Sequence, residues 1–232
     1  MFWAVWIPVS LAITTALSAL WAWLGIAPLL TLDIVQALGW AGPFAVAGAV
    51  LLGLVVGDFF AYWFHRAQHA WLWRFHAVHH SITDLNAVNS YHHASEAFFN
   101  TIIVALPISL VMVNYGPTIP LIGMIIWFQV VFLHSPTNVN FGFLRVIVAD
   151  NRFHRIHHSM ERHHFDKNFG ITFSFWDRLF GTAYYPKQDE WPAVGLAEIA
   201  QPQSVREWID LPFRYRAEAA VDKDMAAKGA PA

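Results

Sequence analysis

His65-Arg66-Ala67-Gln68-His69 follows directly on a long apolar run, and its two histidines are one helical turn apart. Related spacing recurs in His76-Ala77-Val78-His79-His80 and in His154-Arg155-Ile156-His157-His158. All thirteen histidines of the chain lie between His65 and His164. Spacings of three and four residues place side chains on one face of a helix. Because a helix presents several imidazoles to one metal ion in this way, the spacing predicts metal ligands rather than packed core histidines.

The sequence around these groups is that of a membrane protein. It is 56% hydrophobic and 13% charged, whereas ordinary soluble domains have about 25% charged residues. Four apolar segments, at about 2–30, 44–64, 97–115 and 118–133, approach or exceed the length of about 20 residues that crosses a bilayer. A cleaved signal peptide is disfavoured for the first segment because it has no Lys or Arg and is too long. We therefore expect an all-α fold, an integral-membrane four-helix bundle of two hairpins with a histidine-rich helical cap.

The positive charges predict the orientation of this bundle. No Lys or Arg precedes Arg66, and none lies between Arg74 and Arg145, so both expected loops between spans lack positive charge. By the positive-inside rule, the histidine-rich cap and both termini are cytoplasmic, in an inner, plasma or endoplasmic-reticulum-type membrane. We expect residues 1–186 to form the membrane-embedded domain and residues 187–232 a polar cytoplasmic tail.

Composition also excludes several function classes. The net charge of −2 argues against a nucleic-acid partner. The chain has no cysteine, which rules out disulfides, thiolate ligands and iron–sulfur clusters. No glycine-rich phosphate loop is present. A metal must therefore be held by imidazole, carboxylate or amide groups.

Nine imidazoles are well placed to serve as ligands, which suits two metal ions better than one. They are the eight predicted catalytic metal ligands of the spaced groups together with His134, at the end of the fourth apolar segment: His65, His69, His76, His79, His80, His134, His154, His157 and His158. Zinc, iron, copper and nickel all accept such ligands. Carboxylates are expected around them to accept the second ring N–H. Asp58, within an apolar segment, is the first candidate, although it could instead bond Tyr62; weaker candidates are Asp84, Glu96, Asp150, Asp166 and Asp177.

These motifs resemble the fatty acid hydroxylase (sterol desaturase) superfamily. The likeness is carried by four stretches in the same order, 58–69, 72–81, 153–159 and 166–182, and it covers about residues 44–186. Some features are similar to the alkylglycerol monooxygenase branch, including His134 before a short loop with an asparagine. The resemblance implies a membrane-embedded histidine-motif enzyme that uses two Fe²⁺ ions and O₂ to hydroxylate or desaturate a C–H bond of a sterol, a fatty acyl chain or an ether lipid. Zinc could replace iron in a purified sample.

The chain departs from the superfamily pattern in places. Asn138 stands where some members have a second histidine, and it either ligates a metal or caps the turn. His164 is the candidate for a tenth ligand, whereas His92, His93 and His163 are more typical of solvated surface positions. Glu96 resembles a superfamily position in a His-x-x-Glu pattern, so we expect it to orient a ligand, as we expect of Asp58, Asn138 and Asp166.

The resemblance also implies partners. The chain has no nucleotide-binding motif, so electrons would come from a ferredoxin, a cytochrome b5-like protein or a pterin. Arg152, Arg155, Arg162 and Lys167 are candidates for a docking face toward an acidic carrier. An apolar slot for the lipid is expected, with Trp63, Phe64, Phe98, Phe99, Trp127 and Phe128 as candidate lining, although each is more typical of packing or lipid contact.

Two other classes remain as alternatives. A metal transporter also carries histidines near a membrane, but its sites lie near the bilayer midplane. A cytochrome with bis-histidine haem needs single histidines paired across helices. The clustering of histidines beyond one end of the apolar segments favours the oxygenase.

Overall fold

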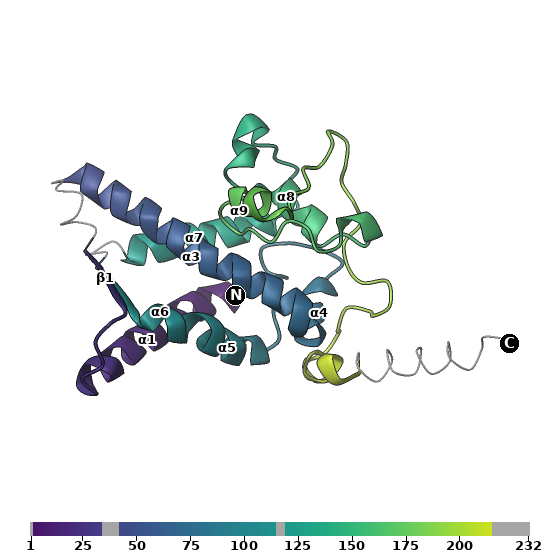
Figure 1. Cartoon of the computed structure of the whole chain (residues 1–232). Coiled ribbons are helices and arrows are strands. Elements are labelled where there is room, and N and C mark those ends of the chain that lie inside the picture. Colours follow the sequence, from purple (N-terminus) through teal and green to yellow (C-terminus); the bar gives the residue numbers. More distant parts are fainter. Residues whose placement is uncertain (1, 34–41, 115–118, 215–232) are drawn as a thin grey trace, which may run out of the picture.

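A computed structural model describes residues 2–33, 42–114 and 119–214. The regular elements of these residues are helices apart from one pair of short strands, so the predicted helical class is confirmed. The elements are α1 (Phe2–Trp23), β1 (Leu30–Asp33), α3 (Pro43–Trp71), α4 (Trp73–His80), α5 (Ser95–Asn100), the π-helix η1 (Thr101–Ala105), α6 (Leu106–Ser109), β2 (Val111–Asn114), α7 (Ile119–Leu133), the 3₁₀-helix η3 (Gly142–Val146), α8 (Asn151–His157), the 3₁₀-helix η4 (Arg162–His164) and α9 (Phe175–Phe180) (Figure 1).

Each of the four apolar segments contains a helix, and these helices pack together. α1 contacts α6, η1 and α7, and α3 contacts α7 and η1. Within the described residues, α3 is the one helix with both the length and the hydropathy to cross a membrane, while 95–109 and 120–133 are shorter apolar helices. α3 runs beyond residue 64, where we expected the span to end, and reaches Trp71. His65 and His69 therefore lie on the same continuous helix as the apolar span.

One feature was absent from the predicted architecture. β1 and β2 pair in parallel, with Leu30 opposite Val111 and Asp33 opposite Asn114. They lie at the end of α3 away from α4, α8 and α9, which gather around its other end (Figure 1). All the histidine-bearing elements are thus at one end of the apolar helices.

Two polar side chains of the apolar helices hold the loops of this end. Gln129 in α7 donates its Nε2 hydrogens to the carbonyls of Ala149 (2.9 Å) and Ile171 (3.1 Å). The Asp58 carboxylate in α3 accepts the backbone N–H groups of Thr172 (2.7 Å) and Phe173 (2.9 Å). Asp58 therefore positions a loop.

The prediction that Asp58 accepts a ring N–H of a histidine is thus wrong, because both of its oxygens face backbone donors. Its alternative partner Tyr62 instead bonds the Thr182 hydroxyl (2.8 Å).

The segment 166–170 is held in an unusual backbone shape. Asp166 (φ 57°) and Asn168 (φ 60°) both lie in the left-handed region, which disfavours most side chains. The buried Asn168 side chain stabilises this shape by donating to the carbonyl of Phe153 (2.8 Å) and accepting from the N–H of Tyr184 (2.7 Å). The buried Asp177 carboxylate accepts from the N–H groups of Phe169 (2.8 Å) and Gly170 (2.7 Å). The side chains of Asn168 and Asp177 thus fix the backbone of this segment.

Candidate metal centre

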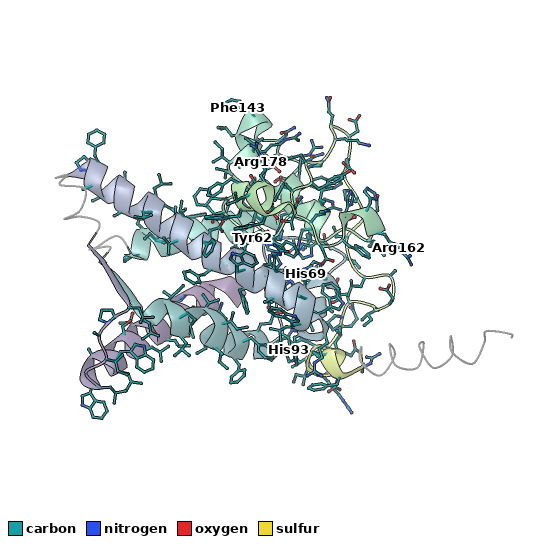
Figure 2. The ribbon with its side chains drawn as sticks, viewed as in Figure 1. Tyr62, His69, His93, Phe143, Arg162 and Arg178 are labelled. Carbon is teal, nitrogen blue, oxygen red and sulfur yellow. The ribbon has the colours of Figure 1, made fainter. Side chains whose placement is uncertain are left out.

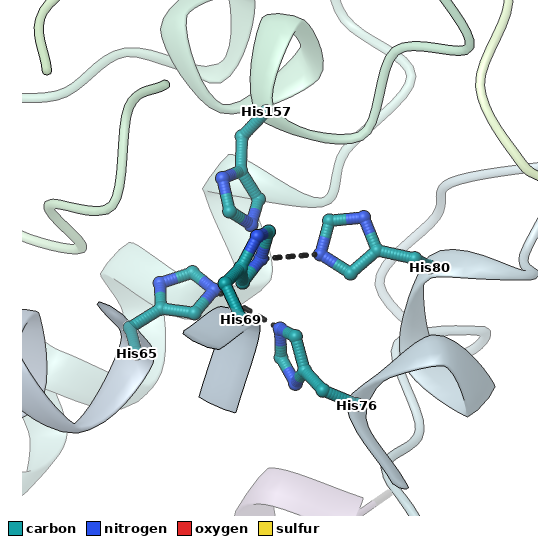
Figure 3. Close-up of side chains that lie close together, drawn as sticks. All are labelled: His65, His69, His76, His80 and His157. Atoms are coloured by element: carbon teal, nitrogen blue, oxygen red, sulfur yellow. Dashed lines mark hydrogen bonds between the residues drawn. The ribbon is translucent and has the colours of Figure 1, made fainter. Parts of the chain in front are cut away.

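The structure brings the nine predicted ligands together in two groups. The first centre consists of His65 and His69 from α3, His76 and His80 from α4, and His157 from α8. Within a centre, the potential ligand atoms all lie within 4.8 Å of one another. Figure 3 shows the five rings of the first centre close together around one point. The second centre consists of His79, His134, His154 and His158.

The two centres are adjacent. The rings of His80 and His158 stack across the boundary with centroids 4.5 Å apart, and those of His76 and His79 are 5.4 Å apart. Eight of the nine histidines are buried, and His69 is intermediate. The arrangement therefore has two neighbouring, largely dehydrated sites.

Hydrogen bonds at Nδ1 fix the tautomers of several rings. Backbone carbonyls accept from the Nδ1–H of His65 (Phe169, 2.9 Å), His157 (Lys167, 2.8 Å), His79 (Tyr91, 3.1 Å) and His134 (Val130, 2.8 Å). A carbonyl oxygen can only accept, so the hydrogen is on Nδ1 and the Nε2 of the neutral ring carries a lone pair. These four rings present Nε2 to their centres.

The facing lone pairs fit a metal ion between them. The Nε2 atoms of His79 and His134 are 3.2 Å apart, although neither carries a hydrogen in the neutral tautomer that its Nδ1 bond selects. Two nitrogen ligands about 2.0–2.1 Å from one metal are themselves about 2.8–3.4 Å apart for right-angle or tetrahedral geometry. Nε2 of His157 and both nitrogens of His158 are buried without a hydrogen-bond partner in the described residues. The donor set therefore fits metal ions at both centres.

Burial keeps these ligands neutral. Removal from water lowers the pKa of His79, His80 and His157 far below the usual histidine value, and neighbouring histidines lower it further. The same cause lowers the pKa of His134 to about 4. Neutral imidazole is the form that binds a metal, so the rings are ready for ligation at neutral pH.

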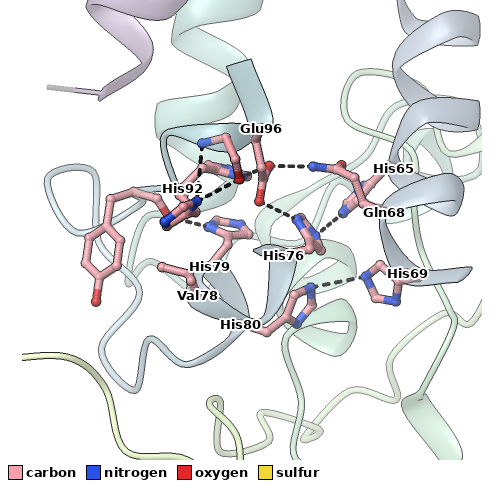
Figure 4. Close-up of polar contacts among 12 residues, drawn as sticks. His65, Gln68, His69, His76, Val78, His79, His80, His92 and Glu96 are labelled. Carbon is pink, nitrogen blue, oxygen red and sulfur yellow. Dashed lines mark hydrogen bonds and ion pairs between the residues drawn. The ribbon is translucent and has the colours of Figure 1, made fainter. Parts of the chain in front are cut away.

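Two predicted carboxylates meet ligands at Nδ1. Glu96 accepts from His76 (3.2 Å) through Oε1 and from His92 (2.7 Å) and Gln68 through Oε2 (Figure 4). Asp166 accepts from His69 (3.2 Å). Three ligands of the first centre therefore have their Nδ1 acceptors in residues 166–170: Asp166, the Lys167 carbonyl and the Phe169 carbonyl.

Other predicted positions lie elsewhere. Asn138 is exposed, and buried Asn151 orders its loop by donating to the Thr137 hydroxyl (3.0 Å). The structure therefore does not bring Asn138 to either centre. His164 bonds Ser159 and Glu190 through its two ring nitrogens and belongs to a separate group.

The weaker carboxylate candidates have other partners as well. Asp150 caps α8 by accepting from the N–H of Phe153 (2.8 Å). Exposed Asp84 accepts from Asn86. Neither meets a ring of the two centres.

His92 is the functional candidate that the sequence reasoning missed. We expected a solvated surface position, but His92 is buried and its ring stacks on His79 with centroids 3.8 Å apart. The signal that could have found it is the nearby carboxylate four residues on, Glu96, although His92 itself precedes α5.

We expect Glu96→Gln to weaken metal binding at the first centre roughly 10- to 100-fold, as is typical when an outer partner of a ligand is lost. Glu96 now accepts three hydrogen bonds, whereas the NH₂ group of glutamine would face one of these three donors. His76 then loses its fixed orientation. Iron titration followed by metal analysis measures the change. Glu207→Gln, outside both centres, should bind iron like the unchanged chain, and equal affinity in both variants would contradict the orienting role of Glu96.

An apolar cavity of about 130 Å³ opens on both centres. His65 and His76 of the first centre and His79, His134 and His154 of the second face it, with Ala61, Phe64, Val104, Val130, Leu133 and Ile171 as its apolar wall. Of the six aromatic residues predicted as lining, Phe64 alone is among the described lining residues. Trp63, Phe98 and Phe128 are exposed, as expected for lipid-facing side chains.

Comparison with known proteins agrees with this geometry. A sequence model of the family described as fatty acid hydroxylase matches residues 50–182, more than half of the chain. The chain belongs to the fatty acid hydroxylase family. This is a family of membrane enzymes with iron and O₂ chemistry. All nine histidines of the two centres lie within the matched range.

Individual relatives are named for different lipid substrates. The chain is 30% identical to an ornithine lipid hydroxylase of Rhizobium tropici over 83% of its own length and 62% of the relative's. It is 30% identical to the alkylglycerol monooxygenase of Homo sapiens over 68% of its length and 34% of the relative's. A Dictyostelium discoideum protein described as a methylsterol monooxygenase is 29% identical, over 62% and 55%. The chain thus spans less than two thirds of each of these relatives, and no solved structure matches it.

Proposed function

We propose that this chain is an integral-membrane di-iron oxygenase that hydroxylates a C–H bond of a lipid with O₂ and external electrons. The observation that carries the proposal is the pair of imidazole centres whose lone pairs converge beside one apolar cavity. Membership of the fatty acid hydroxylase family supports it. The comparisons lend no support to a metal transporter, the alternative class.

In this proposal the first centre holds one iron ion with five histidines and the second holds another with four. Bound iron supplies the reduction of O₂ and the oxidation of the C–H bond. The protein's own residues hold the rings in place, because each Nδ1 bond to a carbonyl or carboxylate fixes both tautomer and ring orientation. Burial of the rings excludes water from the reacting carbon.

The cavity favours a long apolar substrate. Its volume of about 130 Å³ is well below the roughly 300–1,000 Å³ of sites that enclose a whole ligand. It therefore accepts the part of a lipid around the reacting carbon, with the remainder outside. Gln68, Glu96 and Asn100 give it one polar side that suits a polar group of the lipid. The relatives are named as a hydroxylase and monooxygenases, which favours hydroxylation over desaturation.

A second cavity reaches the first centre from another side. It has a volume of about 270 Å³ and is lined by His69, His80 and His157 together with Trp73 and Asp166. We assign it to the approach of electrons, because an external donor there comes close to ligands without entering the lipid cavity.

The predicted basic docking face needs correction. Arg152 is buried and donates to the carbonyl of Gln188 (2.7 Å), and Arg155 donates to that of Pro192 (2.8 Å). Both arginines therefore bond backbone carbonyls of the cap itself. Arg162 is exposed at its outer edge (Figure 2).

For the membrane we propose four spans with a cytoplasmic histidine-rich cap, formed within residues 1–186. The charge distribution supports this orientation, since Arg66 is the first positive charge and it lies at the cap end of α3. The four packed apolar helical segments support the number of spans.

The activity is tested with the iron-loaded full chain in lipid nanodiscs, O₂ and a chemical reductant. Candidate substrates are an ornithine lipid, an alkylglycerol and a methylsterol, with mass spectrometry of the products. We expect one oxygen atom to be added to at least one lipid, with ¹⁸O from ¹⁸O₂ in the product, and no product after iron removal. Product formation that persists without metal, or iron-loaded protein that consumes no O₂ with any of the three lipids, would sink the proposal.

The lipid cavity makes a separate prediction. Ala61→Phe fills the cavity from α3, so we expect product formation to fall about 100-fold while both centres keep their iron, because small displacements of a reacting carbon have such effects. Metal analysis and product assays on the same samples separate the two outcomes. Ala70→Phe, at an exposed position of the same helix, is the matched control and should remain active. Unchanged activity in Ala61→Phe would mean that the lipid binds elsewhere.

A further inference from the structure

Of the three histidines outside the two centres and the Glu96 network, two form a cluster of their own. His163 and His164 lie in η4, and their ligand atoms are within 4.8 Å of each other and of a Glu161 carboxylate oxygen. His163 Nε2 is 3.6 Å from Glu161 Oε2. Glu190, from a loop that follows α9, places Oε1 3.1 Å from His164 Nε2 and 3.9 Å from His163 Nε2. Glu161, His163 and His164 therefore form one group of ligand atoms, and Glu190 approaches both histidines from a second segment.

The cluster is partly built in advance. His164 is fully buried, and its Nδ1 bonds the Ser159 hydroxyl (2.8 Å), which leaves Nε2 directed toward Glu190. The Glu190 carboxylate is held by the Tyr184 hydroxyl (2.9 Å) and by the N–H of Lys187 (2.8 Å). Because a carboxylate only accepts, His164 Nε2 carries the hydrogen in this contact; a bound ion would take its place, with Nδ1 then donating to the Ser159 hydroxyl. Exposed Glu161 and His163 can close on the ion.

Charge and spacing point to a divalent cation. Two carboxylates balance a 2+ charge, and two imidazoles complete a tetrahedral set, which is the coordination that zinc prefers. The donor separations of 3.1, 3.6 and 3.9 Å are close to the roughly 3.3 Å expected between ligands of a tetrahedral zinc ion. This set differs from the two neutral all-histidine centres.

We propose that Glu161, His163, His164 and Glu190 form a third metal site, which binds Zn²⁺ and is separate from the two iron centres. Its ion would join the loop of Glu190 to the turn that leads directly into residues 166–170. Those residues hold the Nδ1 acceptors of three first-centre ligands. The site would therefore be structural, supporting the first centre without contact with substrate.

Zinc titration of the iron-loaded full chain tests this site, with iron and zinc counted by metal analysis after removal of loose ions. We expect one zinc ion per chain to bind while iron stays in place. His163→Ala is the gentlest variant because this side chain is 58% exposed, and it should weaken zinc binding by roughly tenfold or more. Glu190→Gln should do the same, whereas Asp189→Asn, the exposed neighbour, should bind zinc like the unchanged chain.

Three outcomes would overturn the proposal: no zinc bound beyond the iron, zinc that displaces iron ion for ion, or zinc affinity unchanged in both His163→Ala and Glu190→Gln. The readout is independent of lipid oxidation. Failure of the zinc site therefore leaves the proposed oxygenase untouched, and an inactive oxygenase leaves the zinc result interpretable.

Discussion

His157→Ala and His79→Ala are each expected to abolish lipid oxygenation, with a fall of more than about 1,000-fold, because each removes a ligand from one of two adjacent centres. His157 belongs to the first centre and His79 to the second, so each variant should retain iron at the other centre. Metal analysis and product assays on protein purified from membranes measure both effects.

His93→Ala is the matched control for these two variants. His93 bonds Ser95 (2.7 Å) and packs against Trp208 with tilted rings 5.3 Å apart, outside both centres. We expect this variant to keep its iron. Full activity in His157→Ala or His79→Ala, in protein that is correctly inserted, would remove the metal-site argument.

Asp177→Ala is expected to have the largest effect on stability. The carboxylate is fully buried and accepts from the N–H groups of Phe169 and Gly170 and from the Thr182 hydroxyl (2.6 Å). Its removal leaves buried donors without acceptors at a cost of about 1–3 kcal/mol each, so a loss of roughly 3–5 kcal/mol is expected. The Phe169 carbonyl would then no longer be held against His65, and iron should be lost from the first centre.

Thermal unfolding in nanodiscs and iron content measure this variant. Asp210→Asn is a control at a surface ion pair with Arg206 (3.6 Å), where a change below about 1 kcal/mol is expected. If Asp177→Ala unfolded at the temperature of the unchanged chain and kept all its iron, the segment 166–170 would not depend on Asp177 for its position.

Sequence spacing predicts local pairs of ligands well, because i, i+3 and i+4 are neighbours on any helix. It places His65 with His69 and His76 with His80, and the structure brings each pair into the first centre. It does not predict how the groups divide between two ions. That division depends on how α3, α4 and α8 pack, and packing leaves no local pattern.

The outer partners were the least predictable part. Carbonyls such as those of Lys167, Phe169 and Tyr91 have no side-chain signature, so the sequence gives no sign that they accept from ligands. Asp58 was assigned to a ring because an intramembrane carboxylate is commonly functional. Its position on α3 instead faces the backbone of residues 172–173, which belongs to a segment distant in sequence.

The consecutive pairs His79-His80 and His157-His158 have a further consequence. In each pair, one member belongs to one centre and its neighbour to the other, since successive residues of a helix point about 100° apart. The separation of the two centres is therefore limited by two peptide units as well as by the packing of the helices. A twist in either turn moves ligands of both ions together, so neither ion's surroundings can be redesigned alone.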